Sequence, residues 1–180
     1  MTGKTANRMT EKTKKQTDMQ KANNVLFTIY RILLVAILVF AIAFFVFRKN
    51  TVSETPAEEV FQKVSAAVDS EKMAPSSNRF FKKYYGLNAA DYEGILFYAP
   101  VTNMDADELL VVCLKDPGQA EAVTEAILKR QADKAKTFEG YAPEQYALAE
   151  DYLLDVQGNY ILFVVDPNAE AIDAAFAEAL

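Results

Sequence analysis

The 180-residue sequence predicts an α+β protein, with one N-terminal membrane-spanning helix followed by a single domain containing a four-stranded antiparallel sheet packed by helices. Three observations predict this fold class. Residues 25–47 are almost entirely apolar, four later segments have the composition of β-strands, and amphipathic helical patterns flank those strands. The apolar segment is followed by 133 residues, which suits one domain with its own hydrophobic core.

The apolar segment 25–47 contains Arg31 as its single charged residue and has neither glycine nor proline. A helix of this length extends about 34 Å, which is enough for a hydrocarbon core of about 30 Å. Arg31 lies near one end, where its side chain can reach the headgroups, although an ion pair with a partner span is the alternative. A cleaved signal peptide is the other interpretation, but the apolar run exceeds the usual length of a signal-peptide core. We therefore predict an uncleaved anchor.

Charge is divided unevenly along the chain, whose overall net charge is −6. Residues 1–49 carry nine Lys/Arg against two Asp/Glu, for a net charge of +7, and residues 50–180 carry ten against 23, for −13. We expect residues 1–24 to be a disordered basic tail in the cytoplasm, because Lys and Arg favour the inner side of a membrane. Residues 48–55 are then a linker, and residues 56–180 are an extracytoplasmic domain. Its acidic character argues against nucleic acid as a partner.

The first part of the domain is predicted to be helical. Thr55-Pro56-Ala57-Glu58 resembles a capping box with proline at the first helical position, and the apolar periodicity continues to about Val68. Residues 69–76 interrupt the pattern. A second short helix is expected from Ser77 to Tyr85, ending at Gly86.

Strand patterns begin after this helix. Residues 95–98 and 108–115 are predicted strands, after which Asp116-Pro117 starts a long helix that ends at Gly140. Residues 143–149 are expected to form another short helix.

The C-terminal part of the chain predicts a β-hairpin and a last helix. Residues 152–156 and 160–165 flank Gln157-Gly158-Asn159, which is a tight-turn signal, and Asp166-Pro167 opens the helix.

Two strands followed by Asp-Pro and a helix therefore occur twice, with the Asp-Pro pairs fifty residues apart. This pattern is consistent with a duplicated ββα unit, or with two independent uses of a common strand-to-helix connection. Strands 108–115 and 160–165 are apolar on both faces, which predicts central positions, whereas strand 152–156 alternates like an edge strand. We expect two helices on one face of the sheet and the helix 56–68 on the other face or at an end.

The domain also resembles a known family. The resemblance is carried by Asp91-Tyr92, Tyr98-Ala99-Pro100, Met104-Asp105, Glu108 and the segment from Phe138 to Tyr146, and it extends from about Ala57 to Leu180. On these residues the chain is similar to the bacterial family known as domain of unknown function 4358. The resemblance implies a single domain behind an N-terminal membrane anchor or signal, and it implies no activity.

No catalytic, cofactor-binding or metal site is predicted. Histidine is absent, so the commonest general base and metal ligand are missing. Cys113 is the single cysteine and lies in an apolar strand, which predicts a buried core residue without a disulfide. Asp105, Asp107 and Glu108 could ligate calcium, but they lack the spacing of a calcium loop, and we expect them to be solvated acids in a turn.

Tyrosines and acids in the loops are the most suggestive feature. Tyrosine provides rigid contact area with a polar tip, which suits binding surfaces, although these rings could instead cover the ends of the core. The predicted binding surface comprises Tyr84, Tyr85, Tyr98, Asp105, Glu108, Tyr141, Glu144 and Tyr146.

The sequence thus favours a membrane-anchored extracytoplasmic protein of the bacterial cell envelope, single-pass, acting as a non-enzymatic binding or scaffolding module. Its expected partner is an envelope protein or a small ligand. The alternative is a hydrolase that uses carboxylates on envelope material, which requires two acids across a groove. A single-span signalling component is the third interpretation.

Overall fold

The structure is a computed structural model that describes residues 30–40 and 52–180, and it divides into two compact units, Met1–Arg48 and Lys49–Leu180. In the first unit, residues 30–40 are helical. Among the described residues, no helix is both long and apolar enough to cross a membrane. Most of the predicted span 25–47 lies outside the described residues, as do the predicted tail and residues 48–51 of the predicted linker.

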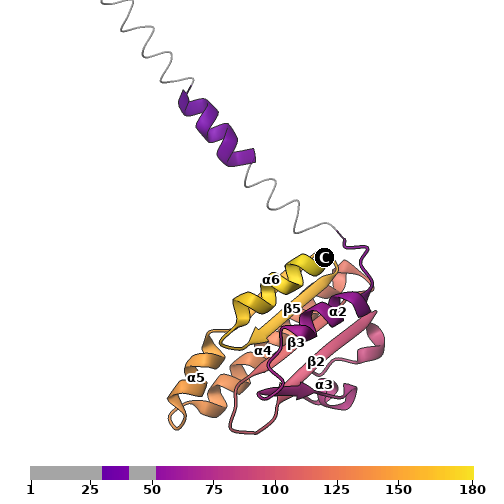
Figure 1. Cartoon of the computed structure of the whole chain (residues 1–180), viewed down its shortest axis with the longest axis vertical. Helices are drawn as coiled ribbons and strands as arrows, with labels where there is room; N and C mark the ends of the chain where they lie inside the picture. The colour runs from indigo at the N-terminus through magenta and orange to yellow at the C-terminus, as the bar shows by residue number, and fades with distance from the viewer. Residues whose placement is uncertain (1–29, 41–51) are drawn as a thin grey trace, which may run out of the picture. The chain divides into compact units, whose positions relative to one another are not determined.

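The second unit is an α+β domain built on one antiparallel sheet, as the sequence predicts (Figure 1). The sheet has five strands in the order β1-β2-β3-β5-β4, whereas four were expected. The additional strand is β1, which has only three residues and no apolar alternation, so the sequence carries no strand signal there. It forms by pairing with the end of β2, where Ala74 lies opposite Ala99. The strands are β1 (Met73–Pro75), β2 (Gly94–Pro100), β3 (Glu108–Cys113), β4 (Leu153–Gln157) and β5 (Tyr160–Val165).

The helices occur close to their predicted positions. Gly86 ends one of them with a φ of 73°, a left-handed conformation that glycine adopts without steric cost. The predicted capping box at Thr55 is wrong, because the Thr55 hydroxyl instead donates to the carbonyl of Leu180. The helices are α2 (Ala57–Ala66), α3 (Asn78–Tyr85), α4 (Ala120–Phe138), α5 (Pro143–Glu150) and α6 (Ala169–Ala179), with short 3-10 turns η1 (Ala89–Asp91) and η2 (Pro117–Gln119).

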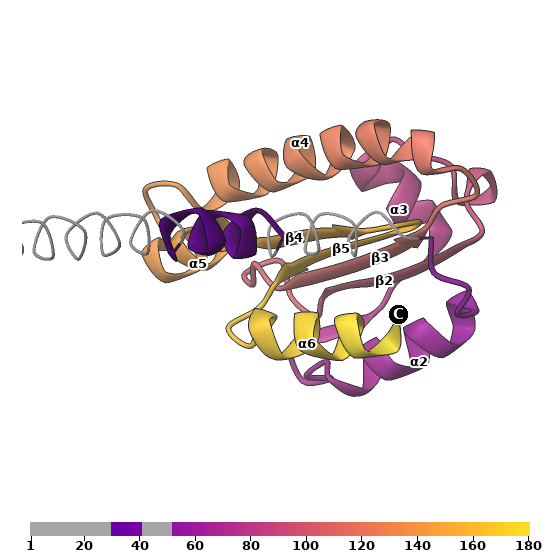
Figure 2. The same ribbon diagram turned by 90° about the horizontal axis from the view of Figure 1, so that it is seen from above.

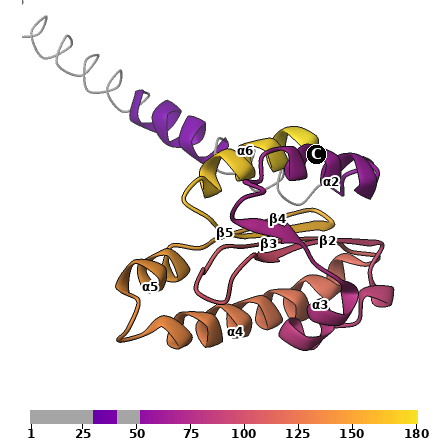
Figure 3. The same ribbon diagram turned by 60° about the horizontal axis from the view of Figure 1, so that its bottom comes forward.

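Helices cover both faces of the sheet, so that the domain has three layers (Figures 2 and 3). One core, called the α2–α6 core, lies between the sheet and α2 and α6, and includes Val64, Leu109 and Phe176. A second core, called the α3–α4 core, lies between the sheet and α3, α4 and α5, and includes Phe81 and Ile127. Strands β3 and β5 are buried on both faces and are central, and β4 is an edge strand, as predicted.

The expected placement of two helices on one face does not hold for the two helices that follow Asp-Pro, because α4 and α6 lie on opposite faces. The residues at equivalent positions before the two helices point to opposite faces of the sheet. Leu114 and Val164 stand two residues before the Asp of each Asp-Pro pair, yet Leu114 belongs to the α3–α4 core and Val164 to the α2–α6 core. A two-fold axis perpendicular to the sheet would place both helices on one face. The two ββα units are therefore not related by such an axis.

Candidate functional site

Buried charge is concentrated at one end of β3. Glu108 begins this strand and is completely buried, with its side chain toward α4. Arg130 and Lys134 are one helical turn apart on α4 and therefore project from the same face of the helix. Arg130 forms two hydrogen bonds to Glu108, from Nε to Oε1 at 3.2 Å and from Nη2 to Oε2 at 2.8 Å. Lys134 donates from Nζ to Oε2 of Glu108 at 2.7 Å and to the carbonyl of Asp107 at 3.2 Å.

Tyr85, at the end of α3, completes this group by donating its hydroxyl to Oε1 of Glu108. We call Tyr85, Glu108, Arg130 and Lys134 the Glu108 network. The chain positions Tyr85 through helical periodicity, because Phe81 and Tyr85 are four residues apart and share the buried face of α3. Their rings pack together with Phe97 of β2.

The network keeps its carboxylate ionised. Burial alone would raise the pKa of Glu108, but the neighbouring Lys134 and Arg130 outweigh it and lower that pKa. Burial lowers the pKa of Lys134, although the Glu108 carboxylate opposes the shift. Burial acts in the same direction on Arg130, but its hydrogen bonds to Glu108 raise its pKa overall. The pKa of Tyr85 is raised by burial and by the adjacent carboxylate, so that its hydroxyl remains a donor.

Tyr84 connects this network to the surface. The guanidinium of Arg130 lies 4.2 Å from the centroid of the Tyr84 ring, which is a close cation–π contact. Lys83 lies 5.5 Å from the centroid of the same ring. The Tyr84 ring also stacks on Phe80 and packs edge-on against Phe97. Arg130 is thus held in place by Glu108 through hydrogen bonds and by Tyr84 through its ring.

The structure brings together three of the predicted binding residues, Tyr84, Tyr85 and Glu108. Two of their partners, Arg130 and Lys134, were missed by the sequence reasoning. The available signal was their i, i+4 spacing on the face of a helix that also carries core residues. The expectation of solvated acids is wrong for Asp107 and Glu108, which are 3% and 0% exposed. The carboxylate of Glu108 is buried because β3 begins at this residue and continues beneath α4.

The other predicted residues lie elsewhere. Tyr98 is half-buried on the α2–α6 side of the sheet, away from Tyr84. Asp105 accepts a hydrogen bond from the Thr102 hydroxyl at 2.7 Å, in the loop between β2 and β3. This loop meets α5, because the backbone N–H of Ala106 donates to Oε1 of Gln145 at 2.7 Å.

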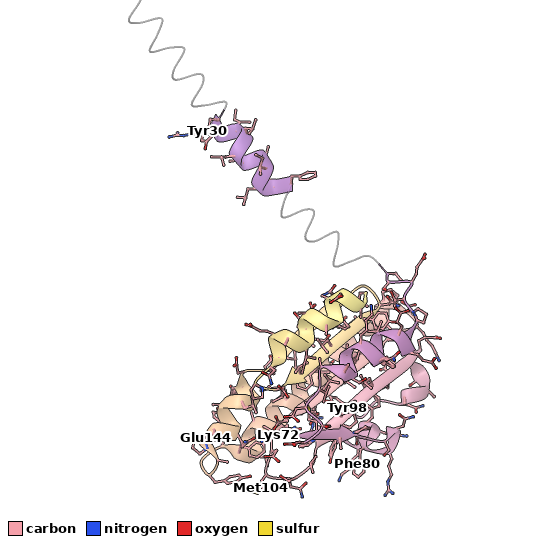
Figure 4. The ribbon with its side chains drawn as sticks, viewed as in Figure 1. Tyr30, Lys72, Phe80, Tyr98, Met104 and Glu144 are labelled. Atoms are coloured by element: carbon pink, nitrogen blue, oxygen red, sulfur yellow. The ribbon has the colours of Figure 1, made fainter. Side chains whose placement is uncertain are left out.

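The aromatic and acidic segment around α5 contains the remaining three predicted residues. Tyr141 is exposed and its ring contacts Phe138, whereas Tyr146 is half-buried against the α3–α4 core. Glu144 projects into solvent at this end of the domain (Figure 4). Tyr146 therefore serves packing, and Tyr141 and Glu144 are available for contacts.

The carboxylate of Glu108 is poorly suited to act as a general base. Both carboxylate oxygens already accept hydrogen bonds from cations, and the lowered pKa makes Glu108 a weak proton acceptor. Within residues 30–40 and 52–180, no group of three or more Cys, Asp or Glu is arranged to hold a metal ion. The network can therefore position Arg130 and Tyr84, but it does not resemble an acid–base pair.

These features define the class of the protein as an α+β domain with a five-stranded antiparallel sheet and an internal ion-pair network. A family model described as Domain of unknown function (DUF4358) matches residues 66–166, and the chain belongs to this family. The match confirms the resemblance seen in the sequence, over a range that ends before α6. No curated protein and no solved structure matches the chain.

Proposed function

We propose that this protein is a single-pass membrane protein of the bacterial cell envelope whose C-terminal domain acts outside the membrane as a non-enzymatic binding or scaffolding module. Residues 30–40 support the membrane part of the proposal. They form a helix on which every residue is exposed, including the apolar Leu33, Ile37 and Phe40. A helix that is apolar all round requires an apolar environment, and the surrounding sequence extends this character over residues 25–47.

A topology experiment tests the membrane part. Intact spheroplasts of cells producing the full chain are treated with protease, and an antibody against the Lys49–Leu180 unit follows the fragments. We expect digestion of the domain without lysis of the cells. Protection of the domain in intact spheroplasts, with digestion after lysis, would contradict the proposal.

The single observation that carries the binding role is the pairing of Glu108. This acid, the most deeply buried in the domain, is neutralised by two cations and hydrogen-bonded by Tyr85, so its role is to hold side chains that reach the surface rather than to take part in a reaction. Aromatic and apolar side chains are exposed on α3, just before α5 and in the loop between β2 and β3, namely Phe80 at 43%, Tyr141 at 55% and Met104 at 60%. Such side chains provide contact area for a partner.

The binding role is tested by cross-linking the full-length protein in intact membranes, purifying it and identifying what is attached by mass spectrometry. We expect a reproducible envelope protein among the products. Tyr141→Ala, which removes an exposed ring, should reduce its recovery, and Tyr152→Phe provides a control that keeps a half-buried ring in the core. Repeated recovery of the protein alone would contradict a binding role.

One observation favours the hydrolase alternative. A cavity of about 360 Å³ lies between the start of α2 and the turn that joins β4 to β5, and Glu58 and Glu93 are among its lining residues. Two carboxylates across a groove are the arrangement that hydrolysis of glycosidic bonds uses. The test is whether the wild type releases soluble fragments from purified envelope material. Release that is lost in the double variant Glu58→Gln, Glu93→Gln would favour the hydrolase over the binding module.

A further inference from the structure

We propose that the exposed face of α3 binds an acidic polypeptide segment of a partner protein, one that carries an aromatic or aliphatic side chain among its acids. This inference rests on the proposed binding role and names the chemistry of the partner. The α3 basic surface is formed by Arg79, Phe80, Lys82 and Lys83, with Tyr84 and Arg130 at its border.

The first argument is the contrast in charge. Residues 50–180 have a net charge of −13, yet three of the eight residues of α3 are basic and none is acidic. Arg79, Lys82 and Lys83 are exposed, and within the described part of the chain none of them forms a salt bridge. Helix α3 is therefore a positive area, free of internal compensation, on an otherwise acidic domain.

The second argument is the apolar content of the same face. Helix α3 has two aromatic pairs at i, i+4 spacing, and only one pair, Phe81 and Tyr85, is buried in the core. The other pair, Phe80 and Tyr84, lies next to it, with Phe80 43% exposed and stacked on Tyr84. Phe80 projects from the domain surface in Figure 4. A purely ionic ligand would leave this ring in water, whereas an apolar side chain of a peptide would cover it.

The third argument is that the side chain of Arg130 is already ordered in the free protein. Its Nε and Nη2 are bonded to Glu108 and its guanidinium lies on Tyr84, so the side chain is ordered before a ligand arrives. Nη1 takes no part in these bonds, and the side chain remains 18% exposed. Because the rotamer is already fixed, less conformational entropy is lost when a carboxylate binds there. Arg130 and Lys83 flank the Tyr84 ring and provide two positive groups at one place.

The size of the surface separates an acidic peptide from other anions. Eight helical residues extend about 12 Å, which is similar to the screening length at physiological salt. A nucleic acid or an anionic bilayer carries charge far beyond this distance and would meet the acidic remainder of the domain. A short acidic segment places its charge on α3 alone.

The experiment uses the full-length protein in a neutral detergent and a fluorescent synthetic peptide of repeated Glu-Glu-Phe units. Binding is followed by fluorescence anisotropy at low and at high salt. The test variant, R79Q/K82Q/K83Q, removes three charges from α3, and the control variant, K63Q/K115Q/K136Q, removes three exposed charges elsewhere. Equal near-UV circular dichroism and melting temperature establish that both variants are folded.

We expect the α3 variant to bind the peptide at least about tenfold more weakly than the wild type, and the control variant to lose less than about twofold. Phe80→Ser should weaken binding as well, and replacing Glu by Gln in the peptide should abolish it. Equal losses in the two triple variants would overturn the inference, because net charge alone would then explain binding. Binding of phosphatidylglycerol vesicles or RNA through α3, without binding of the peptide, would also overturn it.

Cross-linking of the same variants in intact membranes separates this inference from the proposed function. A partner that is captured by the wild type and the control but lost with R79Q/K82Q/K83Q, and whose cross-linked segment is acidic, supports both. A partner captured equally by all three proteins overturns the α3 site and leaves the binding role intact. Capture of nothing by the wild type overturns the binding role itself.

Discussion

The two faces of the sheet share their central strands but are filled differently. The α2–α6 face is packed by fully buried apolar side chains such as Val60, Leu162 and Ile172. The α3–α4 face has an apolar core as well, but it also encloses Glu108 and Lys134. On the α2–α6 side the sheet buries one acid, Asp155, in its edge strand β4, whereas on the α3–α4 side a central strand carries the buried ion pairs of Glu108.

This difference indicates what the Glu108 network contributes. Apolar contacts tolerate small shifts of one helix against a sheet, because they have no direction. Glu108, in contrast, satisfies its two oxygens only when Arg130 and Lys134 face it at hydrogen-bonding distance. Burial of ions contributes little net stability, but it is costly when one partner is lost. We infer that the network fixes the rotation of α4 over the sheet, and with it the position of Arg130 beside Tyr84.

The largest effect is expected from Glu108→Leu, which leaves two cations facing each other in the core. Loss of one partner from a buried ion pair costs about 3–5 kcal/mol, and we expect the free energy of unfolding to fall by this amount. Urea denaturation of the full-length protein, followed by the fluorescence of its tyrosines, measures it. The triple variant Glu108→Leu, Arg130→Leu, Lys134→Met should recover much of the loss, because it removes every charge and leaves only the Tyr85 hydroxyl without its acceptor. If the triple variant had the same low free energy of unfolding as Glu108→Leu, the loss would come from altered packing rather than from unpaired charge.

Neighbouring carboxylates at the start of β3 should respond to pH in opposite directions. The pKa of Glu108 is lowered in the folded state from its ordinary value of 4.5, so its stabilising contribution is complete above about pH 4.5 and is lost as the pH falls through the folded-state pKa. The pKa of Asp107 is raised from 3.8, mainly by burial. Its folded form binds the proton more readily, so its contribution decreases as the pH rises through the raised pKa.

Denaturation between pH 3 and pH 7 tests this pair of shifts. Below about pH 4.5 the wild type should lose stability more steeply than the triple variant that lacks the network. Asp107→Asn, which cannot ionise, should gain stability relative to the wild type as the pH rises above 4. Parallel pH profiles for all three proteins would contradict the assignment.

Periodicity predicted most of the fold, because its signals are local. The strand patterns around Val111 and Leu162 and the Asp-Pro helix starts needed only neighbouring residues to be recognised. β1 was missed because its three residues form a strand only through pairing with β2. The placement of α4 and α6 on opposite faces of the sheet was not predicted, because it depends on the face to which the last residues of each preceding strand point. Tyr85 and Glu108 were placed in the predicted binding surface because their burial depends on residues distant in sequence: Tyr85 packs against Phe97, and Glu108 is paired with Arg130 and Lys134.

An intermediate effect is expected on the apolar face, at Gly94. A Cβ atom there would lie 2.9 Å from the Phe61 ring and 3.1 Å from the Cβ of Ala57, so α2 packs this closely because the first residue of β2 has no side chain. We expect Gly94→Ala to cost about 1–3 kcal/mol through overpacking. Adding Phe61→Leu removes the ring atoms concerned and should recover part of this loss. If the loss of unfolding free energy in the double variant equalled the sum of the losses in the two single variants, the contact between residue 94 and the Phe61 ring would not be the cause.

The smallest effect compares one ring on each face. Tyr84 and Tyr98 are both half-buried, but only Tyr84 has a guanidinium over its ring. Replacement by leucine keeps apolar contact in both places, so the difference between the two losses reports the ring-specific contacts of Tyr84, of which the cation–π contact with Arg130 is worth about 0.5–1 kcal/mol. Tyr84→Leu should therefore lose more stability than Tyr98→Leu in urea, and high salt should reduce the difference only slightly, because Arg130 is largely shielded from solvent. Equal losses would mean that Arg130 is held by Glu108 alone, and that the Tyr84 ring does not contribute to its position.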